Sequence, residues 1–110
     1  VEKEYPNIQF HFVRTIVIDH ATVNPDRHGY QLHASLNQPK SRGQVTLNSS
    51  NPYDHPKIKF NYLENNYDLK ETIKCIHVAR KILNQASMQP FAGKEIGPGE
   101  NAEADKGIED

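Results

Sequence analysis

A punctuated segment at residues 39–63 constrains the fold of this chain more than any other feature. It reads PKSRGQVTLNSSNPYDHPKIKFNYL, and apolar and polar residues alternate within residues 44–48 and again within 57–61. A period of two is typical of half-buried strands. Pro52 and Pro56 lie between the two runs and break the chain, because proline lacks a backbone donor and restricts its predecessor. The segment therefore predicts a β-hairpin with a long loop, and we expect Gly43 to supply a positive φ at its entry.

Two further strands are predicted upstream of the hairpin. Residues 8–18 are rich in β-branched and aromatic side chains, which favours one long strand, or two with a bend near Arg14. Residues 30–37 alternate again and predict another strand, while residues 19–29 are polar and predict a loop. Because successive side chains of a strand point to opposite sides, the first strand has an apolar face and a second face. The apolar face carries Ile8, Phe10 and Phe12, and the second face carries Gln9, His11 and Val13.

A helix is predicted from about Asp68 to Ala86. Asp68 can cap its first turn, Glu71 can reach back to the cap, and Pro90 marks its end. Its apolar stripe is expected to pack, and its lysines to face water. The stripe comprises Leu69, Thr72, Ile73, Cys75, Ile76, Ala79, Ile82, Leu83 and Ala86. Strands followed by one long helix predict an α+β fold, with an antiparallel or mixed sheet covered on one face by a long amphipathic helix.

Composition limits what such a chain can do alone. Its 110 residues suffice for one small core, and an apolar fraction of 35% with a mean hydropathy of -0.80 predicts a thin core or one that leans on a neighbour. The chain begins with Val1 and almost at once enters a strand, so we expect a piece of a larger protein. A net charge of -1 gives no field that would recruit nucleic acid. No leader or membrane-spanning run is evident, and the single cysteine, Cys75, is compatible with a reducing cytoplasm.

The residues that carry chemistry are few. The six histidines lack the short spacings typical of zinc sites, so no metal is expected. No Gly-x-Gly-x-x-Gly turn is present, and Gly97-Pro98-Gly99 is interpreted as an ordinary turn. Nothing around Cys75 indicates a nucleophile. Tyr30, Tyr53, Tyr62 and Tyr67 could contribute cation–π contacts to a quaternary ammonium group.

The 39–63 segment resembles the C-terminal signature of the glucose-methanol-choline (GMC) family of flavin-dependent alcohol oxidoreductases. The resemblance continues over Ala79-Arg80-Lys81-Ile82 and Glu95-Ile96-Gly97-Pro98-Gly99, and it covers roughly residues 6–99. It departs from the family pattern at 19–29 and 101–110. The resemblance implies that residues 1–99 are part of the substrate-binding domain of an FAD-dependent oxidoreductase, and we expect 100–110 to be an acidic, loosely ordered tail.

The resemblance also implies which parts are missing. In the family FAD is bound elsewhere, by a flavin-binding domain of the same chain, and the catalytic histidine follows the acidic tail. We therefore expect this piece to be inactive alone and to have no catalytic residue. The parent is expected to oxidise a primary alcohol, with choline to betaine aldehyde as the closest match, and to be cytoplasmic, with membrane association of the parent left open.

One site residue is carried over from the family. Gln9-Phe10-His11-Phe12 resembles the strand that in choline-oxidising members supplies a substrate-binding histidine to the pocket wall, and His11 matches it. His33 is interpreted as structural or facing solvent. The alternative for His11 is a surface or inter-sheet histidine held by a backbone carbonyl. The alternative for the whole chain is a non-enzymatic α+β binding or interaction module.

Overall fold

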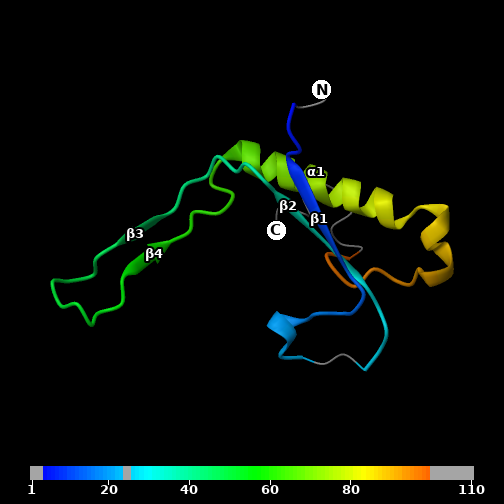
Figure 1. Cartoon of the computed structure of the whole chain (residues 1–110), viewed down its shortest axis with the longest axis horizontal. Helices are drawn as coiled ribbons and strands as arrows, with labels where there is room; N and C mark the ends of the chain where they lie inside the picture. The colour runs from blue at the N-terminus through cyan, green and yellow to red at the C-terminus, as the bar shows by residue number, and fades with distance from the viewer. Residues whose placement is uncertain (1–3, 24–25, 100–110) are drawn as a thin grey trace.

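The computed structural model describes residues 4–23 and 26–99. Its elements, in chain order, are β1 (Ile8–Val13), η1 (Asp19–Ala21), β2 (Gln31–Leu36), β3 (Gln44–Thr46), β4 (Lys57–Lys59), α1 (Asn66–Leu83) and η2 (Ala86–Phe91), where η marks a 3-10 helix (Figure 1). Strands β1 and β2 form one antiparallel sheet, and β3 and β4 form another. The α+β class is confirmed. The tail predicted at residues 100–110 lies outside the described residues.

Helix α1 covers one face of the β1–β2 sheet and packs mainly on β2 (Figure 1). The register places three apolar residues of each strand on the same face, pairing Ile8 with Leu36, Phe10 with Ala34, and Phe12 with Leu32. All of these side chains are half-buried except that of Phe12, which is exposed and stacks on Tyr30 with ring centroids 5.6 Å apart. The predicted division of β1 into two faces is therefore confirmed. The strand ends at Val13, just before the bend expected near Arg14.

The predicted limits and caps of the helix are wrong. Helix α1 begins at Asn66, and the Asn65 side chain caps it by accepting a hydrogen bond from the Tyr67 amide at 2.9 Å. Asp68 therefore falls inside the first turn, where it is buried. Glu71 does not reach back to the cap; it accepts hydrogen bonds from Asn7 Nδ2 at 3.1 Å and from Lys74 Nζ at 2.6 Å.

The helix also ends earlier than predicted. It stops at Leu83, and the amide of the C-cap residue Asn84 donates to the Arg80 carbonyl oxygen at 2.9 Å. Pro90 does not terminate the helix, since it lies inside η2. Arg80 of α1 binds the segment that follows η2. Its Nη2 donates to Glu95 Oε1 at 2.8 Å, and the same carboxylate oxygen accepts the Gly99 amide at 3.0 Å. The chain up to Gly99 is thus tied back to the helix.

The interior is small, as the composition predicted. Among the described residues, the buried apolar side chains are Ile16, Ile73, Cys75 and Ala79, and the buried acidic ones are Asp68 and Glu71. Leu69, Ile76 and Leu83 of the predicted stripe are half-buried, whereas Ile82 and Ala86 are exposed. Two strands are too narrow to cover the whole apolar stripe of an 18-residue helix.

Cys75 lies at the centre of this interior, with 1% of its surface exposed. Burial raises the pKa of its thiol, and the nearby negative charge of Glu71 raises the pKa further. Because the thiolate is the reactive form, we expect native protein to react slowly with a thiol reagent such as DTNB. Reaction should become fast and stoichiometric in denaturing urea. Rapid labelling of the native chain would contradict this placement.

Strands β3 and β4 form an arm that extends away from α1 and the first sheet (Figure 1). We call residues 42–62 the arm. Val45 lies opposite Ile58 in the register, and the rings of Phe60 and Tyr62 stack with centroids 5.1 Å apart. The large apolar side chains of the arm are all exposed, namely Val45, Leu47, Tyr53, Ile58, Phe60 and Tyr62. The predicted hairpin is confirmed, but its strands make no extensive contact with the other described elements.

The reason for Gly43 differs from the prediction. Gly43 does not have a positive φ; Gly99 is the described glycine that does, with a φ of 83°. A Cβ at Gly43 would instead lie 2.5 Å from the Lys59 carbonyl oxygen and 2.8 Å from that of Phe60. Glycine is needed here because the returning strand passes directly against its Cα.

Gly43→Ala should therefore destabilise the arm by about 1–3 kcal/mol, the usual cost of forcing extra volume into a packed site. Gly93→Ala is the matched control, since nothing lies within 4 Å of a Cβ at that position. Hydrogen exchange of the β3 and β4 amides measures the effect directly. Equal protection of those amides in the two variants would show that the close approach is not needed.

Candidate functional site

The face of the β1–β2 sheet that lies opposite α1 carries the predicted site residue. We call it the open face, made up of Gln9, His11 and Val13 from β1 and Gln31, His33 and Ser35 from β2. His11 is exposed on it, rather than packed beneath the helix. His33 is exposed as well, and the register places it directly opposite His11. Side chains at such positions have Cβ atoms roughly 4.5–5.5 Å apart, so the two imidazoles are neighbours.

The side chain of Gln31 fixes one end of this face. Its Oε1 accepts the Val17 amide at 3.0 Å, and its Nε2 donates to the Val17 carbonyl oxygen at 2.9 Å. These two bonds of opposite polarity determine which end of the amide is oxygen. The same Oε1 lies 3.4 Å from His33 Nε2. Gln31 thus ties the chain that follows β1 to β2 and contacts the second imidazole.

A second feature lies where the arm meets the helix, and we call it the arm root. The Asp68 carboxylate accepts the Lys40 amide at 2.7 Å and the Ser41 amide at 2.6 Å. The Ser41 hydroxyl in turn accepts the Asn65 amide at 3.1 Å, and Asn61 Nδ2 donates to the Arg42 carbonyl oxygen at 3.0 Å. The buried carboxylate therefore binds the backbone of the two residues that precede the arm, and each of its oxygens accepts one of these amides.

These bonds govern the ionisation of Asp68. Burial by itself raises the pKa of this carboxyl, but the hydrogen bonds from Lys40 and Ser41 and the charge of Arg42 outweigh it. The net pKa of Asp68 lies below its ordinary value of 3.8. A carboxylate held ionised by backbone amides is a poor general base. The arm root is accordingly a structural contact between the helix and the chain that leads into the arm.

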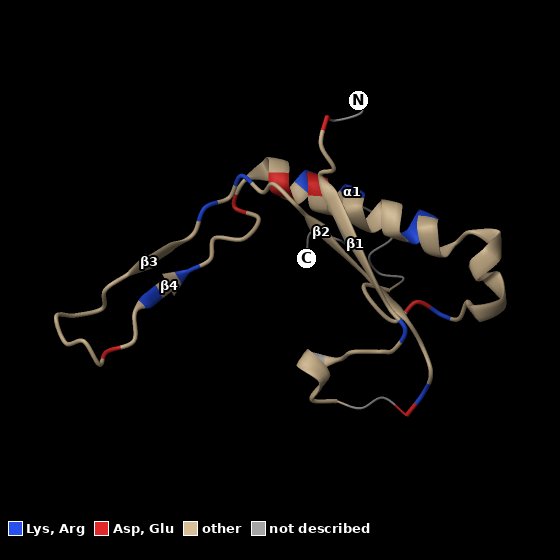
Figure 2. Cartoon of the chain, in the orientation of Figure 1, with Lys and Arg blue, Asp and Glu red and all other residues tan. Residues whose placement is uncertain are grey.

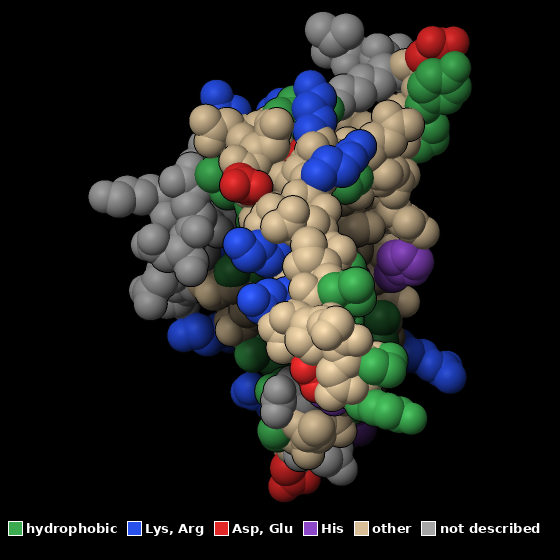
Figure 3. Space-filling view, turned by 90° about the vertical axis from the view of Figure 1, so that its left-hand side faces the viewer, with side chains coloured by type: hydrophobic (Ala, Val, Ile, Leu, Met, Phe, Trp, Pro, Cys, Tyr) green, Lys and Arg blue, Asp and Glu red, His purple; other side chains and the backbone are tan. Residues whose placement is uncertain are grey.

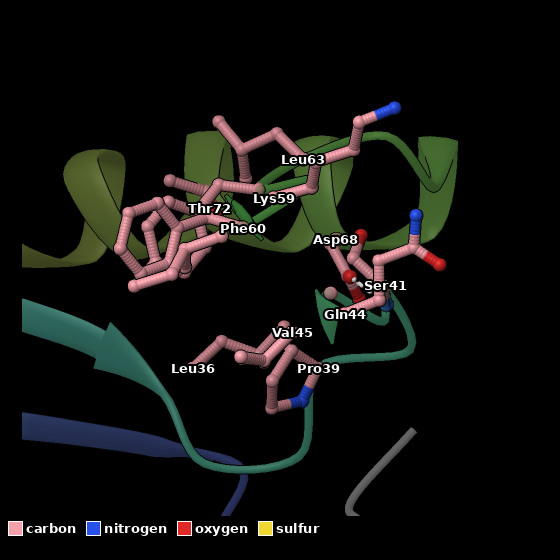
Figure 4. A pocket seen from close by; sticks show the side chains of 13 residues that line it. Leu36, Pro39, Ser41, Gln44, Val45, Lys59, Phe60, Leu63, Asp68 and Thr72 are labelled. Carbon is pink, nitrogen blue, oxygen red and sulfur yellow. Dashed lines mark hydrogen bonds between the residues drawn. The ribbon is translucent and has the colours of Figure 1, made fainter. Parts of the chain in front are cut away.

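A groove of about 640 Å³ opens between the arm and the first turns of α1 (Figure 4). Most of its wall is apolar, from Leu36, Pro39, Val45, Ile58, Phe60, Tyr62 and Leu63, with Asp68 and Ser41 at its inner end. Figure 4 shows Asp68 pointing toward Ser41. The groove can accept apolar surface, and its carboxylate already accepts two backbone amides.

The structure does not bring the four tyrosines together. Tyr30 stacks on Phe12, and Tyr62 stacks on Phe60 of the arm. The ring of Tyr67 lies 4.1 Å from Lys40 Nζ, which already occupies its face as a cation–π partner. Tyr53 is at the far end of the arm and is 91% exposed. Within the described part of the chain these rings form no cage for an ammonium group.

Charge and metal ligands give no further site in the described ranges. Basic and acidic residues are interspersed over arm, helix and loops (Figure 2), and apolar, basic and acidic side chains alternate on the surface seen from the arm side (Figure 3). Within residues 4–23 and 26–99, no three His, Cys, Asp or Glu side chains cluster in a way that could hold a metal ion. A search of those residues also finds no helix long and apolar enough to cross a membrane.

The described residues do not fit FAD. A pyrophosphate is normally bound at a helix N-terminus that follows a glycine-rich turn, where free amides point at the ligand. At the start of α1 the Asn65 side chain caps the first turn, and the anionic Asp68 lies just inside it. Gly97-Pro98-Gly99 is held by Glu95 and precedes no described helix.

Comparison with known proteins gives the class of this chain. The family model for GMC oxidoreductase matches residues 39–110, a span that begins just before the arm. The chain therefore belongs to the GMC oxidoreductase family, as the 39–63 signature predicted.

Curated relatives extend the similarity to nearly the whole chain. An oxygen-dependent choline dehydrogenase of Vibrio vulnificus (strain YJ016) is 42% identical over 106 residues, which are 96% of this chain and 19% of that protein. The oxygen-dependent choline dehydrogenase of Staphylococcus aureus (strain JH9) is 41% identical over 109 residues, 99% of this chain and 19% of the relative. The chain thus spans about a fifth of the length of these relatives.

Sequence reasoning placed His11 but missed what surrounds it. Alternation in residues 8–13 is a local signal, and it was enough to put His11 opposite the apolar face. The pairing of His11 with His33 depends on strand register, and the bonds of Asp68 join residues 27 and 28 positions apart. No local pattern encodes such contacts. The strict alternation of residues 30–37 does favour a strand, and antiparallel pairing of the two strands would have made His33 a candidate neighbour.

Proposed function

We propose that this chain is the substrate-side part of an FAD-dependent alcohol dehydrogenase, and that the parent enzyme oxidises choline to betaine aldehyde. Family membership supports the oxidoreductase class, and the printed names of the two relatives support choline as the substrate. Residues 1–99 belong to the substrate-binding domain. The observation that carries the proposal is the open face, which presents His11 on the side of the sheet that the helix leaves uncovered.

In this proposal His11 forms part of the substrate-pocket wall. The sheet fixes the backbone of a paired strand, and the exposed imidazole of His11 is attached to that backbone. A ring nitrogen can therefore be positioned toward the substrate oxygen. Oxidation of an alcohol would transfer the hydroxyl proton to the catalytic base and a hydride from the carbon to FAD, both outside this chain. Negative charge develops on the oxygen as the proton leaves, before the C–H bond has fully broken. A hydrogen bond from the imidazole to that oxygen becomes stronger as the charge develops, and therefore stabilises the transition state more than the ground state.

The rest of the site comes from other parts of the same enzyme. Four of the six side chains of the open face are exposed, and Val13 and Gln31 are half-buried, so a second domain can reach this face. We propose that the flavin-binding domain covers it, supplies FAD and completes the cage around the ammonium group. The parent is proposed to act in the cytoplasm, with membrane association left to a direct fractionation experiment.

The 110-residue chain should neither bind FAD nor oxidise choline, because the phosphate-binding turn and the catalytic base are supplied from outside it. Absorbance of the purified chain near the flavin bands, after incubation with FAD and gel filtration, measures this. The full-length enzyme, treated in the same way, is the positive control. Stoichiometric flavin retained by the 110-residue chain would contradict the proposal.

A further inference from the structure

We propose that His33 is a second substrate-binding residue of this wall, and that its Nδ1 accepts a hydrogen bond from the hydroxyl group of the alcohol. The inference rests on the proposed function, since it requires the open face to line the pocket. It adds a residue that the sequence interpretation assigned to structure or solvent.

The first step is position. His33 lies opposite His11 on adjacent antiparallel strands, and both side chains are exposed on the open face. The other residues of this face are Gln9, Val13, Gln31 and Ser35, none of which titrates. A substrate oxygen within hydrogen-bond distance of one imidazole is therefore within reach of the other.

The second step is the protonation of the ring. Gln31 Oε1 is an acceptor, because the same atom accepts the Val17 amide while Gln31 Nε2 donates to the Val17 carbonyl oxygen. An acceptor at 3.4 Å from His33 Nε2 favours the tautomer that carries the proton on this nitrogen. In the neutral ring the proton is then absent from Nδ1, so Nδ1 is an acceptor. The Gln31 amide thus favours one tautomer of its neighbour.

The third step is what such an acceptor does. A lone pair on Nδ1 binds the O–H of the ground-state alcohol. The hydroxyl must turn from Nδ1 to the catalytic base outside this chain, which takes the proton, and the lone pair cannot stabilise the oxygen that remains. The hydrogen bond is therefore made in the ground state, which affects KM or an inhibition constant, while His11 acts mainly on turnover. The two imidazoles have different roles. His33 orients the hydroxyl of the bound alcohol, and His11 stabilises the negative charge on its oxygen after the proton has left.

The test uses two competitive inhibitors of the full-length flavoenzyme that cannot be oxidised: a tertiary alcohol analogue of choline, which retains the O–H, and its methyl ether, which does not. His33→Leu should raise the inhibition constant of the tertiary alcohol about tenfold, the loss of one ordinary hydrogen bond, and leave that of the ether unchanged. His33→Gln, which keeps an acceptor, should recover part of the loss. His55→Leu, the same change at an exposed position of the arm, is the control, and Tm is measured for every variant.

The outcomes separate the two proposals. If His33→Leu leaves both inhibition constants unchanged, or weakens alcohol and ether equally, while His11→Ala still lowers turnover, the role of His33 is refuted and the proposed function stands. If neither histidine variant alters turnover or binding, both are refuted. Loss of the preference for the alcohol over its ether in His33→Leu alone supports the hydrogen bond.

Discussion

Replacing His11 by alanine in the full-length enzyme should lower kcat by about 30-fold to 1,000-fold, with little change in Tm. The expected size corresponds to about 2–4 kcal/mol of transition-state stabilisation, the typical loss when one preorganised donor to a developing oxyanion is removed. Thermal stability should be nearly unaffected, because His11 is exposed and no apolar packing is lost.

Steady-state kinetics with choline, together with a thermal melt, measures both quantities. His77→Gln, a change at an exposed position of α1, is the control for removing an imidazole from the surface. Unchanged turnover in His11→Ala would assign the residue to the surface. A fall in Tm that matches the fall in activity would make it structural instead.

Asp68→Ala should give the largest loss of stability of any single carboxylate change in the chain, with Tm lower by several degrees. It leaves the Lys40 and Ser41 amides without their acceptor at the arm root. Asp68→Asn should also destabilise, because its amide nitrogen would place a donor against one of the two donating amides. The exposed Glu64→Gln is the matched control, a carboxylate change just before the same helix.

The dependence on pH follows from the lowered pKa of Asp68. A group whose pKa is lower in the folded state stabilises the fold fully above its unfolded value, and loses that contribution as pH falls through the folded value. Stability should therefore decline below about pH 4. The difference in urea midpoint between wild type and Asp68→Ala should become smaller as the pH is lowered from neutral to acidic. A difference that stays constant with pH would contradict an ionised Asp68.

Local patterns in the sequence predicted most of the fold. Alternation of apolar and polar residues found all four strands, and the 3.6-residue period found α1, because side chains of one face recur with the period of the element. The helix start was misplaced because Asn65 and Asp68 are both good caps, and only the partner of Asp68 in space decides between them. These partners are the amides of Lys40 and Ser41, which donate to the Asp68 carboxylate at the arm root. Gly43 was correctly expected to be special, but the cause is the backbone of β4 rather than a turn.

The site was predictable only as a resemblance. The residues Gln9-Phe10-His11-Phe12 carried the similarity to choline-oxidising enzymes, and alternation gave the direction of the side chain. The surroundings of His11 depend on the register with β2 and on the Gln31 bonds to Val17, neither of which is visible in any short segment.

The most direct test of the account is a crystal structure of the full-length enzyme with FAD and the tertiary alcohol analogue of choline. The account predicts that the open face of the β1–β2 sheet lines the cavity in front of the flavin, with a His11 ring nitrogen within about 3 Å of the ligand oxygen. A structure in which the open face is turned to solvent, or is covered by protein away from the flavin, would contradict it.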